Sequence, residues 1–174
     1  GFDAELVLDA LPELGGIDAT FILAGTLGAS DRARFDAERA RRPDHLAAVD
    51  LPDDAALRRL FAAVDLAALP LRPGSYGLPV LVASRYGAVP VAPAVGAVGE
   101  LVVDADAALV TGSGFVFDEL DAVGLVGALA RAVAACRRPE WPALVARVMR
   151  RDTSWDRPAR RYLQLYRQVI AGKA

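Results

Sequence analysis

The sequence has few of the residues on which disulfide and metal chemistry depend. Cys136 is its one cysteine and His45 its one histidine. A disulfide within the chain is therefore excluded, and we expect neither a metal site nor a cofactor. The longest apolar stretch, residues 86–99, is interrupted by Pro90 and Pro93 and is shorter than the roughly 18 residues of a membrane span. Because the N-terminus also lacks a basic segment and an apolar signal core, we expect a reducing, cytoplasmic setting without membrane contact.

Aromatic residues and an excess of positive charge are also missing. Aromatic residues make up 7% of the chain, whereas hydrophobic residues make up 54%, so the apolar content is mostly alanine, valine and leucine. This composition is typical of buried strands and layered helices, and it argues against disorder. Lysine and arginine number 20 against 22 acidic residues. A net charge of −2 provides no basic field for nucleic acid, which we exclude as a partner.

Short apolar segments alternate with amphipathic segments along the chain. The spacing predicts helices at 3–14, 30–41, 53–64, 79–86, 118–136, a short one after Pro139 and a last one from 154, with strands at 20–24, 45–49, 65–69, 89–92 and 115–117. We expect Ser30 and Asp118 to cap their helices at the N-terminal end, and Gly87 to end its helix.

Strands that alternate with helices indicate parallel βαβ units. The sequence therefore predicts an α/β fold with a Rossmann-like, doubly wound parallel sheet over a single domain, residues 1–174. Ligands of such sheets bind at the carboxyl ends of the strands, here loops 25–29, 70–77 and 93–99. A sheet of this kind usually opens on a strand, whereas this chain opens on a helix. We expect the first strand to lie upstream, in a longer parent protein.

Five segments carry a resemblance to a known family. They are FDAELVLDALPEL near the start, FAAVDLAALPLRPGSYGL from Phe61, SRYGAVPV from Ser84, TGSGFVFDELD from Thr111 and SWDRPARRYLQLYR from Ser154. In order and spacing they resemble the C-terminal half of bacterial glycogen synthases and plant starch synthases, which have the GT-B fold of two Rossmann-like domains. The closing helix, residues 154–174, is similar to one that packs toward the N-terminal domain in that family.

The resemblance implies a function. This domain would hold ADP-glucose, and an N-terminal acceptor-binding domain of the same protein would hold an α-1,4-glucan. The reaction would be a retaining transfer of glucose to the non-reducing end of the glucan, without a required metal. A diphosphate leaving group needs cationic side chains or backbone N–H groups near it.

The same resemblance shows where this sequence departs from the family. The donor-binding glutamate of the family falls on Gly74, and a second glutamate falls on Val82. The glycine pair that meets glucose and phosphate becomes Gly96 and Ala97. We assign no catalytic residue, and the candidate donor-binding residues are Ser75, Tyr76, Gly77, Leu78, Gly96 and Ala97.

Each candidate has a structural alternative. Tyr76 is either a stacking platform or a packed loop aromatic, and Glu100 either caps a helix or contacts ligand. The glycines at 25, 28, 112 and 114 are better explained as turn residues than as phosphate contacts, and Cys136 as a small buried hydrophobe. We give His45 little weight as a catalytic base. The arginines at 131, 137, 138, 150 and 151 are expected on solvated helix faces. The stripe Trp155, Ala159, Tyr162, Leu163, Tyr166 and Ile170 is expected in the core.

Three functional hypotheses follow. The first is a glycosyltransferase domain of the glycogen synthase type. The second is a non-catalytic relative with a regulatory, glucan-binding or scaffold role, because turn glycines survive where side-chain ligands do not. The third keeps catalysis but changes the donor or acceptor, with Arg72, Ser75 and Tyr76 forming a rebuilt pocket.

Overall fold

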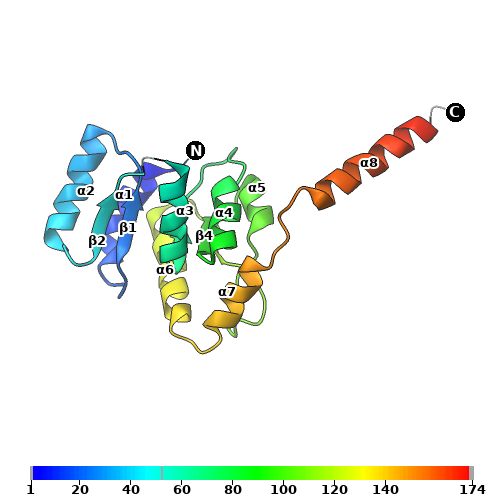
Figure 1. Cartoon of the computed structure of the whole chain (residues 1–174). Helices are drawn as coiled ribbons and strands as arrows, with labels where there is room; N and C mark the ends of the chain where they lie inside the picture. The colour runs from blue at the N-terminus through cyan, green and yellow to red at the C-terminus, as the bar shows by residue number, and fades with distance from the viewer. Residues whose placement is uncertain (1, 52, 173–174) are drawn as a thin grey trace.

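The computed structural model, which describes residues 2–51 and 53–172, alternates helices with short parallel strands (Figure 1). In chain order the elements are α1 (Ala4–Leu14), β1 (Phe21–Ala24), α2 (Ala29–Arg41), β2 (Leu46–Val49), α3 (Asp54–Ala63), β3 (Leu66–Ala68), α4 (Leu78–Tyr86), β4 (Val89–Pro93), α5 (Gly96–Leu101), β5 (Phe115–Phe117), α6 (Ala122–Cys136), α7 (Trp141–Met149) and α8 (Asp156–Ala171). The predicted strands and helices are confirmed to within a few residues, and α5 was not predicted. No described helix has both the length and the hydropathy to cross a membrane.

The strands form two parallel sheets. One has the order β1-β2 and the other the order β3-β4-β5. Helix α1 packs against both α2 and α6, so it joins the half of the molecule that holds β1 and β2 to the half that holds β4 (Figure 1). The parallel α/β fold class is confirmed, and the upstream strand that would complete a single sheet stays a prediction.

The three-stranded sheet is covered on both faces. Alternate residues of its strands point to opposite sides: Val89 and Val91 pack in the core beneath α1 and α6, whereas Ala92 packs in the core formed with α3, α4 and α5. Leu66 and Ala67 divide between the two cores in the same way. This double coverage leaves the carboxyl ends of the strands, and the loops that follow them, as the accessible edge.

Two of the predicted N-caps were wrong. Helix α2 begins after Gly28, which makes no side-chain capping bond, and Ser30 lies inside the first turn. Helix α6 is capped by Asp121, whose carboxylate accepts the N–H of Gly124 at 2.7 Å. Asp118 and Asp121 are both of a residue type that caps helices. A turn over 119–121 separates Asp118 from the helix, so Asp121 is the residue that caps it. Gly87 ends α4 with φ 87°, as predicted.

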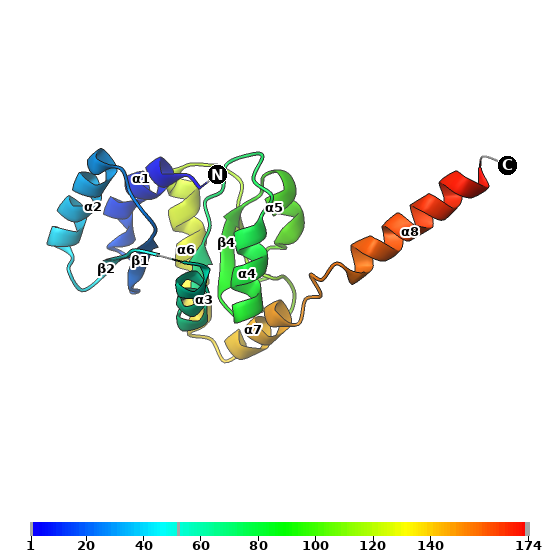
Figure 2. The same cartoon turned by 45° about the horizontal axis from the view of Figure 1, so that its top comes forward.

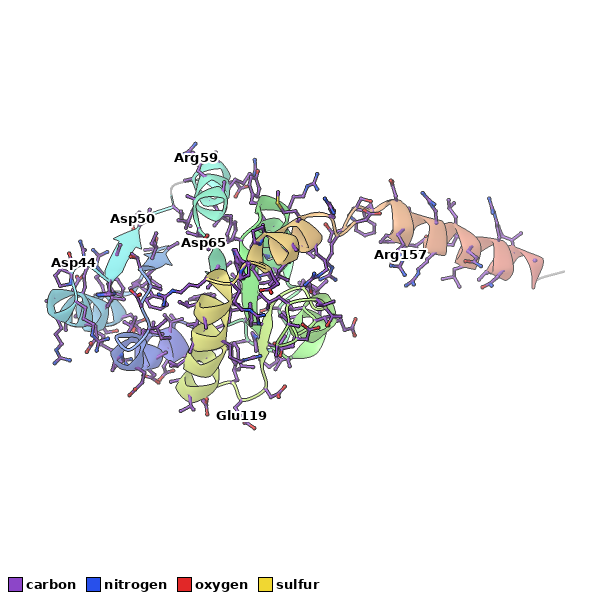
Figure 3. The ribbon with its side chains drawn as sticks, turned by 90° about the horizontal axis from the view of Figure 1, so that it is seen from below. Asp44, Asp50, Arg59, Asp65, Glu119 and Arg157 are labelled. Atoms are coloured by element: carbon purple, nitrogen blue, oxygen red, sulfur yellow. The ribbon has the colours of Figure 1, made fainter. Side chains whose placement is uncertain are left out.

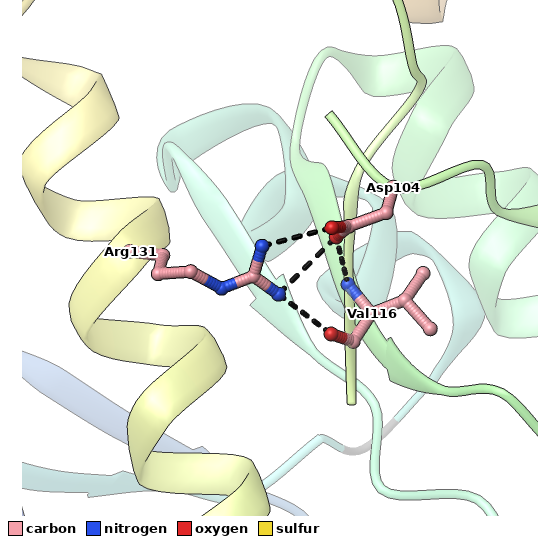
Figure 4. Close-up of polar contacts among 3 residues, drawn as sticks. All are labelled: Asp104, Val116 and Arg131. Carbon is pink, nitrogen blue, oxygen red and sulfur yellow. Dashed lines mark hydrogen bonds and ion pairs between the residues drawn. The ribbon is translucent and has the colours of Figure 1, made fainter. Parts of the chain in front are cut away.

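The free edge of β5 is closed by two side chains (Figure 4). The backbone groups of Val116 point away from β4, because those of Phe117 bond toward it. Asp104 accepts the N–H of Val116 at 2.7 Å, and Arg131 of α6 donates to its carbonyl at 2.6 Å. Arg131 also donates to both carboxylate oxygens of Asp104, at 2.8 and 3.2 Å. Asp104 and Arg131 therefore bind the N–H and carbonyl of Val116, which an edge strand would otherwise leave unpaired.

Helix α8 extends away from the rest of the molecule (Figures 1 and 2). None of the residues of α8 that the structure describes is buried, and Figure 3 shows Arg157 well separated from the body of the protein. The expectation that Tyr162, Leu163 and Tyr166 belong to the core is therefore wrong within this chain. The apolar stripe exists, but it faces solvent.

Candidate functional site

The donor loop, residues 70–78, connects β3 to α4 at the carboxyl end of the sheet. Its course depends on Gly74 and Gly77, with φ of 87° and 72°, values that residues with a Cβ rarely adopt. The N–H of Ser75 donates to the carbonyl of Arg72 at 3.2 Å and closes a turn, and Gly77 is the N-cap of α4, which Leu78 begins. These glycines give the loop its shape whatever side chains it carries.

A buried carboxylate anchors the loop to the start of α1. The Arg72 guanidinium donates to both oxygens of Asp3, at 2.9 and 3.0 Å, and the N–H of Asp3 donates to the carbonyl of Pro70 at 2.8 Å. The hydrogen bond from Arg72 is the main reason that the pKa of Asp3 lies below its usual value of 3.8. Arg72 is thus paired within the protein, which weakens its role in the rebuilt-pocket hypothesis.

The tip of the loop is open. Tyr76 is 91% exposed and Leu78 is 64% exposed, so the interpretation of Tyr76 as a packed loop aromatic is wrong. A Cβ at Gly74 would meet no atom within 4 Å. Position 74, onto which the resemblance places the family's donor-binding glutamate, therefore has room for a side chain and carries none.

The second candidate segment is the start of α5, which follows β4. Gly96 has φ 51°, and both Gly96 and Ala97 are exposed. Val95, the N-cap, makes no side-chain capping bond. Because the first N–H groups of a helix have no intrahelical acceptor, those of Gly96 and Ala97 can donate to a ligand. Glu100 lies inside α5 and is exposed, so its interpretation as a capping residue is wrong, and its contact with a ligand stays a prediction.

Packing brings the donor loop and α5 together. A Cβ at Gly77 would lie 2.4 Å from Cδ1 of Leu101 and 3.7 Å from Cγ2 of Val98. Both of these residues belong to α5. The candidate donor residues of the two segments therefore share one end of the β3–β4 pair, as the strand order requires.

Other candidates from the sequence lie elsewhere or are structural. The ring of His45 is at the amino end of β2, with Nδ1 3.2 Å from the carbonyl of Ala19, so it faces the wrong end of the sheet for catalysis. A Cβ on Gly112 would lie 2.4 Å from Cα of Ala105, and one on Gly114 would lie 2.5 Å from the carbonyl oxygen of Pro90. Close backbone approach thus explains both glycines; Gly112 also has a positive φ of 87°, whereas Gly114 lies in a β-bridge with Asp104 and not in the turn that was expected.

The thiol of Cys136 is half-buried, and burial raises its pKa to about 11. It is therefore protonated at neutral pH, in keeping with its expected role as a small hydrophobe. No three acidic, histidine or cysteine residues within 2–51 and 53–172 are grouped so that they could hold a metal ion.

A groove of about 380 Å³ lies at the end of β5, beside the start of α6. Asp118, Glu119 and Asp121 line it, and Figure 3 shows Glu119 pointing outward at this end of the molecule. These carboxylates would repel a diphosphate, and none of the six candidate donor residues lines the groove. The groove therefore does not replace the candidate donor site, and its location at the donor loop and α5 stays a prediction.

The arginines that were expected on solvated faces are mostly engaged. Arg137 donates to Asp18 at 2.5 Å, Arg138 to the carbonyl of Ala107, and Arg151 to the carbonyl of Leu101. Arg147, which the sequence did not single out, donates to the carbonyls of Leu109, Thr111 and Gly112 at 2.8–3.1 Å. These contacts were missed because most of the acceptors are backbone carbonyls. Every residue has a backbone carbonyl, so such an acceptor gives no pattern in the sequence.

Comparison with known proteins supports the family. No protein-family model matches the chain. A glycogen synthase of Anaeromyxobacter dehalogenans is 37% identical over 170 residues, which cover 97% of this chain and 35% of that protein. A glycogen synthase of Leptothrix cholodnii is 40% identical over 172 residues, 95% of this chain and 35% of that protein.

Solved structures agree. The catalytic domain of starch synthase IV from Arabidopsis thaliana, bound to ADP and acarbose, superposes with a TM-score of 0.78 at 27% identity over 96% of this chain and 36% of that one. Sucrose-phosphate synthase from Thermosynechococcus elongatus shares the fold, with a TM-score of 0.61 at 20% identity.

Fold and sequence together define a GT-B glycosyltransferase domain. Within that class, the chain is a glycosyltransferase domain of the glycogen and starch synthase type, to which it is similar over nearly its whole length. It spans about a third of the length of the curated relatives that it matches, so it corresponds to one part of such an enzyme.

Proposed function

We propose that the chain is the nucleotide-sugar half of an enzyme that transfers glucose from ADP-glucose to an α-1,4-glucan. The observation that carries the proposal is the donor loop: Gly77 keeps a positive φ at the start of α4, and α5 packs directly against it. The similarity to glycogen synthases over nearly the whole chain supports the same reaction.

Backbone groups and Tyr76 would perform the binding. The N–H groups of Gly96 and Ala97, at the start of α5, would donate to the phosphate oxygens as negative charge develops on the leaving diphosphate. The exposed ring of Tyr76 offers a flat face for a base or sugar, and Ser75 and Leu78 would complete the loop side of the pocket.

The rest of the site would come from another domain. We propose that an N-terminal acceptor-binding domain of the same protein docks on α8, whose apolar face has no partner among the described residues. An α-glucan would bind between the two domains. The cytoplasm is the setting that we propose, because a single cysteine allows no disulfide within the chain, as is usual for proteins of reducing compartments.

A second candidate function is a non-catalytic role, and a specific observation favours it. The resemblance places two family glutamates on Gly74, which is exposed, and on Val82, which is partly buried against the core of α3, α4 and α5. Loss of one charged contact to a transition state costs about a hundredfold in rate. Nucleotide binding through the backbone would survive such losses better than transfer would.

A transfer assay separates the two functions. The full-length protein is supplied with ADP-glucose and a malto-oligosaccharide, and ADP release and chain extension are measured together. The proposed function predicts that both occur in equal amounts. Neither ADP release nor chain extension, in a protein that binds ADP in calorimetry, would instead establish the non-catalytic role.

A further inference from the structure

Leu101 lies between the two candidate donor segments. Its side chain fills the space beside Gly77 in the donor loop, and it is the last residue of α5. Helix α5 has only six residues, too few for its own hydrogen bonds to hold it in place. Val98 anchors the middle of α5 in the core, and the contacts of Leu101 fix the end of α5 against the donor loop.

Arg151 secures that end of α5. Its guanidinium donates to the carbonyl of Leu101 and to Oγ of Ser113, the latter at 3.1 Å. Ser113 is only 6% exposed, and its hydroxyl also accepts the N–H of Val103 at 3.0 Å. A single guanidinium thus joins the end of α5 to the segment that leads into β5.

Helix α7, which precedes Arg151, rests on α4. Arg85 of α4 donates to the carbonyl of Met149 at 3.2 Å. Gly87, at the end of α4, approaches α7 so closely that a Cβ there would lie 3.3 Å from Sδ of Met149 and 3.4 Å from Cγ1 of Val145. These contacts form a closed loop. Helix α4 begins at the donor loop and packs on α7, and α7 leads to Arg151. Arg151 in turn bonds to Leu101, which packs against Gly77 of the donor loop.

We propose that Arg151 is a positioning residue of the donor site, holding α5 at a fixed distance from the donor loop without touching the ligand. This inference rests on the proposed function, because it takes these two segments as the donor site. An arginine suits the role because its planar fork reaches two acceptors at once. Removing it would release Leu101 and let α5 move relative to Gly77.

The test compares three variants of the full-length protein. Arg151→Met removes the donors but keeps much of the side-chain length, and Arg151→Lys keeps one donor group. Arg150→Ala is the matched control, because Arg150 is the neighbouring arginine and is exposed. Calorimetry gives the Kd for ADP, and hydrogen exchange reports on residues 72–78, 96–101 and, as a reference, 4–14.

Loss of an outer supporting contact is expected to weaken ADP binding about tenfold in Arg151→Met. Exchange should rise in 72–78 and 96–101 and stay unchanged in 4–14, and Arg151→Lys should restore part of both effects. An ADP Kd within about twofold of wild type, or an equal loss in Arg150→Ala, would overturn the proposal. If wild-type protein binds no ADP, the proposed function fails, and the exchange data alone then decide whether Arg151 holds the two segments.

Discussion

The donor loop takes its backbone course from Gly74 and Gly77, both with positive φ. Gly77 lies against Leu101, whose side chain occupies the space that a side chain at position 77 would need. Gly74 faces open space, so nothing in this chain requires the small residue there except its conformation. The position onto which the resemblance places the family's donor-binding glutamate therefore has a backbone conformation typical of glycine and carries no carboxylate.

A substitution can restore that chemistry. In the full-length protein, Gly74→Glu should bind ADP-glucose about tenfold more tightly, because a hydrogen bond to a charged group contributes about 1.5–3 kcal/mol. Because a residue with a Cβ is strained at the positive φ of position 74, the substitution should lower the free energy of unfolding by about 1 kcal/mol. Gly74→Gln is the control, with the same strain and no charge. Equal affinities for the two variants would show that the carboxylate has no role at this position.

Acid should weaken the anchor of the donor loop. The pKa of Asp3 is lowered, mainly by Arg72, so the ionised carboxylate stabilises the fold. That contribution is complete above the ordinary pKa of 3.8 and is lost as pH falls through the lower folded-state pKa. Asp3→Asn keeps an N-cap acceptor and removes the charge. In urea unfolding, the stability difference between wild type and Asp3→Asn should be constant near neutral pH and should shrink below 3.8. A difference that does not change with pH would contradict this.

At the scale of elements, the edge of β5 depends on the pair Asp104 and Arg131 (Figure 4). Arg131→Ala leaves the carbonyl of Val116 without its donor and should lower the free energy of unfolding by about 1–2 kcal/mol. It should also promote self-association at the opened edge. Urea unfolding and light scattering measure the two effects.

The control for this variant is Arg137→Ala, which removes an exposed ion pair with Asp18. Exposed pairs contribute little to stability, so its urea midpoint should stay near that of wild type. Identical midpoints for Arg131→Ala and Arg137→Ala would show that the β5 edge needs no side-chain closure.

The sequence was enough to predict every strand and every helix except α5, because strands buried on both faces are short continuous apolar runs, whereas amphipathic helices are longer and repeat about every 3.6 residues. The loop after β3 was located in the same way. Helix α5 was missed because its residues, Gly96–Leu101, contain two glycines and span fewer than two turns. The role of Arg151 could not be predicted, because its acceptors lie 50 and 38 positions away in the sequence.

At the scale of the whole molecule, α8 extends away from the other helices (Figure 2), and none of its described residues is buried. The period of its apolar residues correctly predicted an amphipathic helix, but a period does not say which protein surface covers the apolar face. Within this chain that face is exposed. We therefore expect α8 to contribute to activity and to contribute little to the stability of the remaining chain.

Two measurements test this division. Removing residues 154–174 should leave the urea midpoint of the chain unchanged, because the described residues of α8 bury nothing. In the full-length protein, Tyr166→Glu should reduce transfer, because it places a charge in the docked apolar face. Gln164→Glu, which helical spacing places on the opposite face, should have little effect. A similar loss in both variants would argue against docking through the apolar face.

The central claim is that this domain still binds a nucleotide sugar, and calorimetric titration of the full-length protein with ADP and ADP-glucose tests it most directly. We predict micromolar binding of both ligands, weakened in Tyr76→Ala and Ser75→Ala. The absence of detectable binding up to millimolar nucleotide would contradict the claim, and the fold would then have been kept for another purpose.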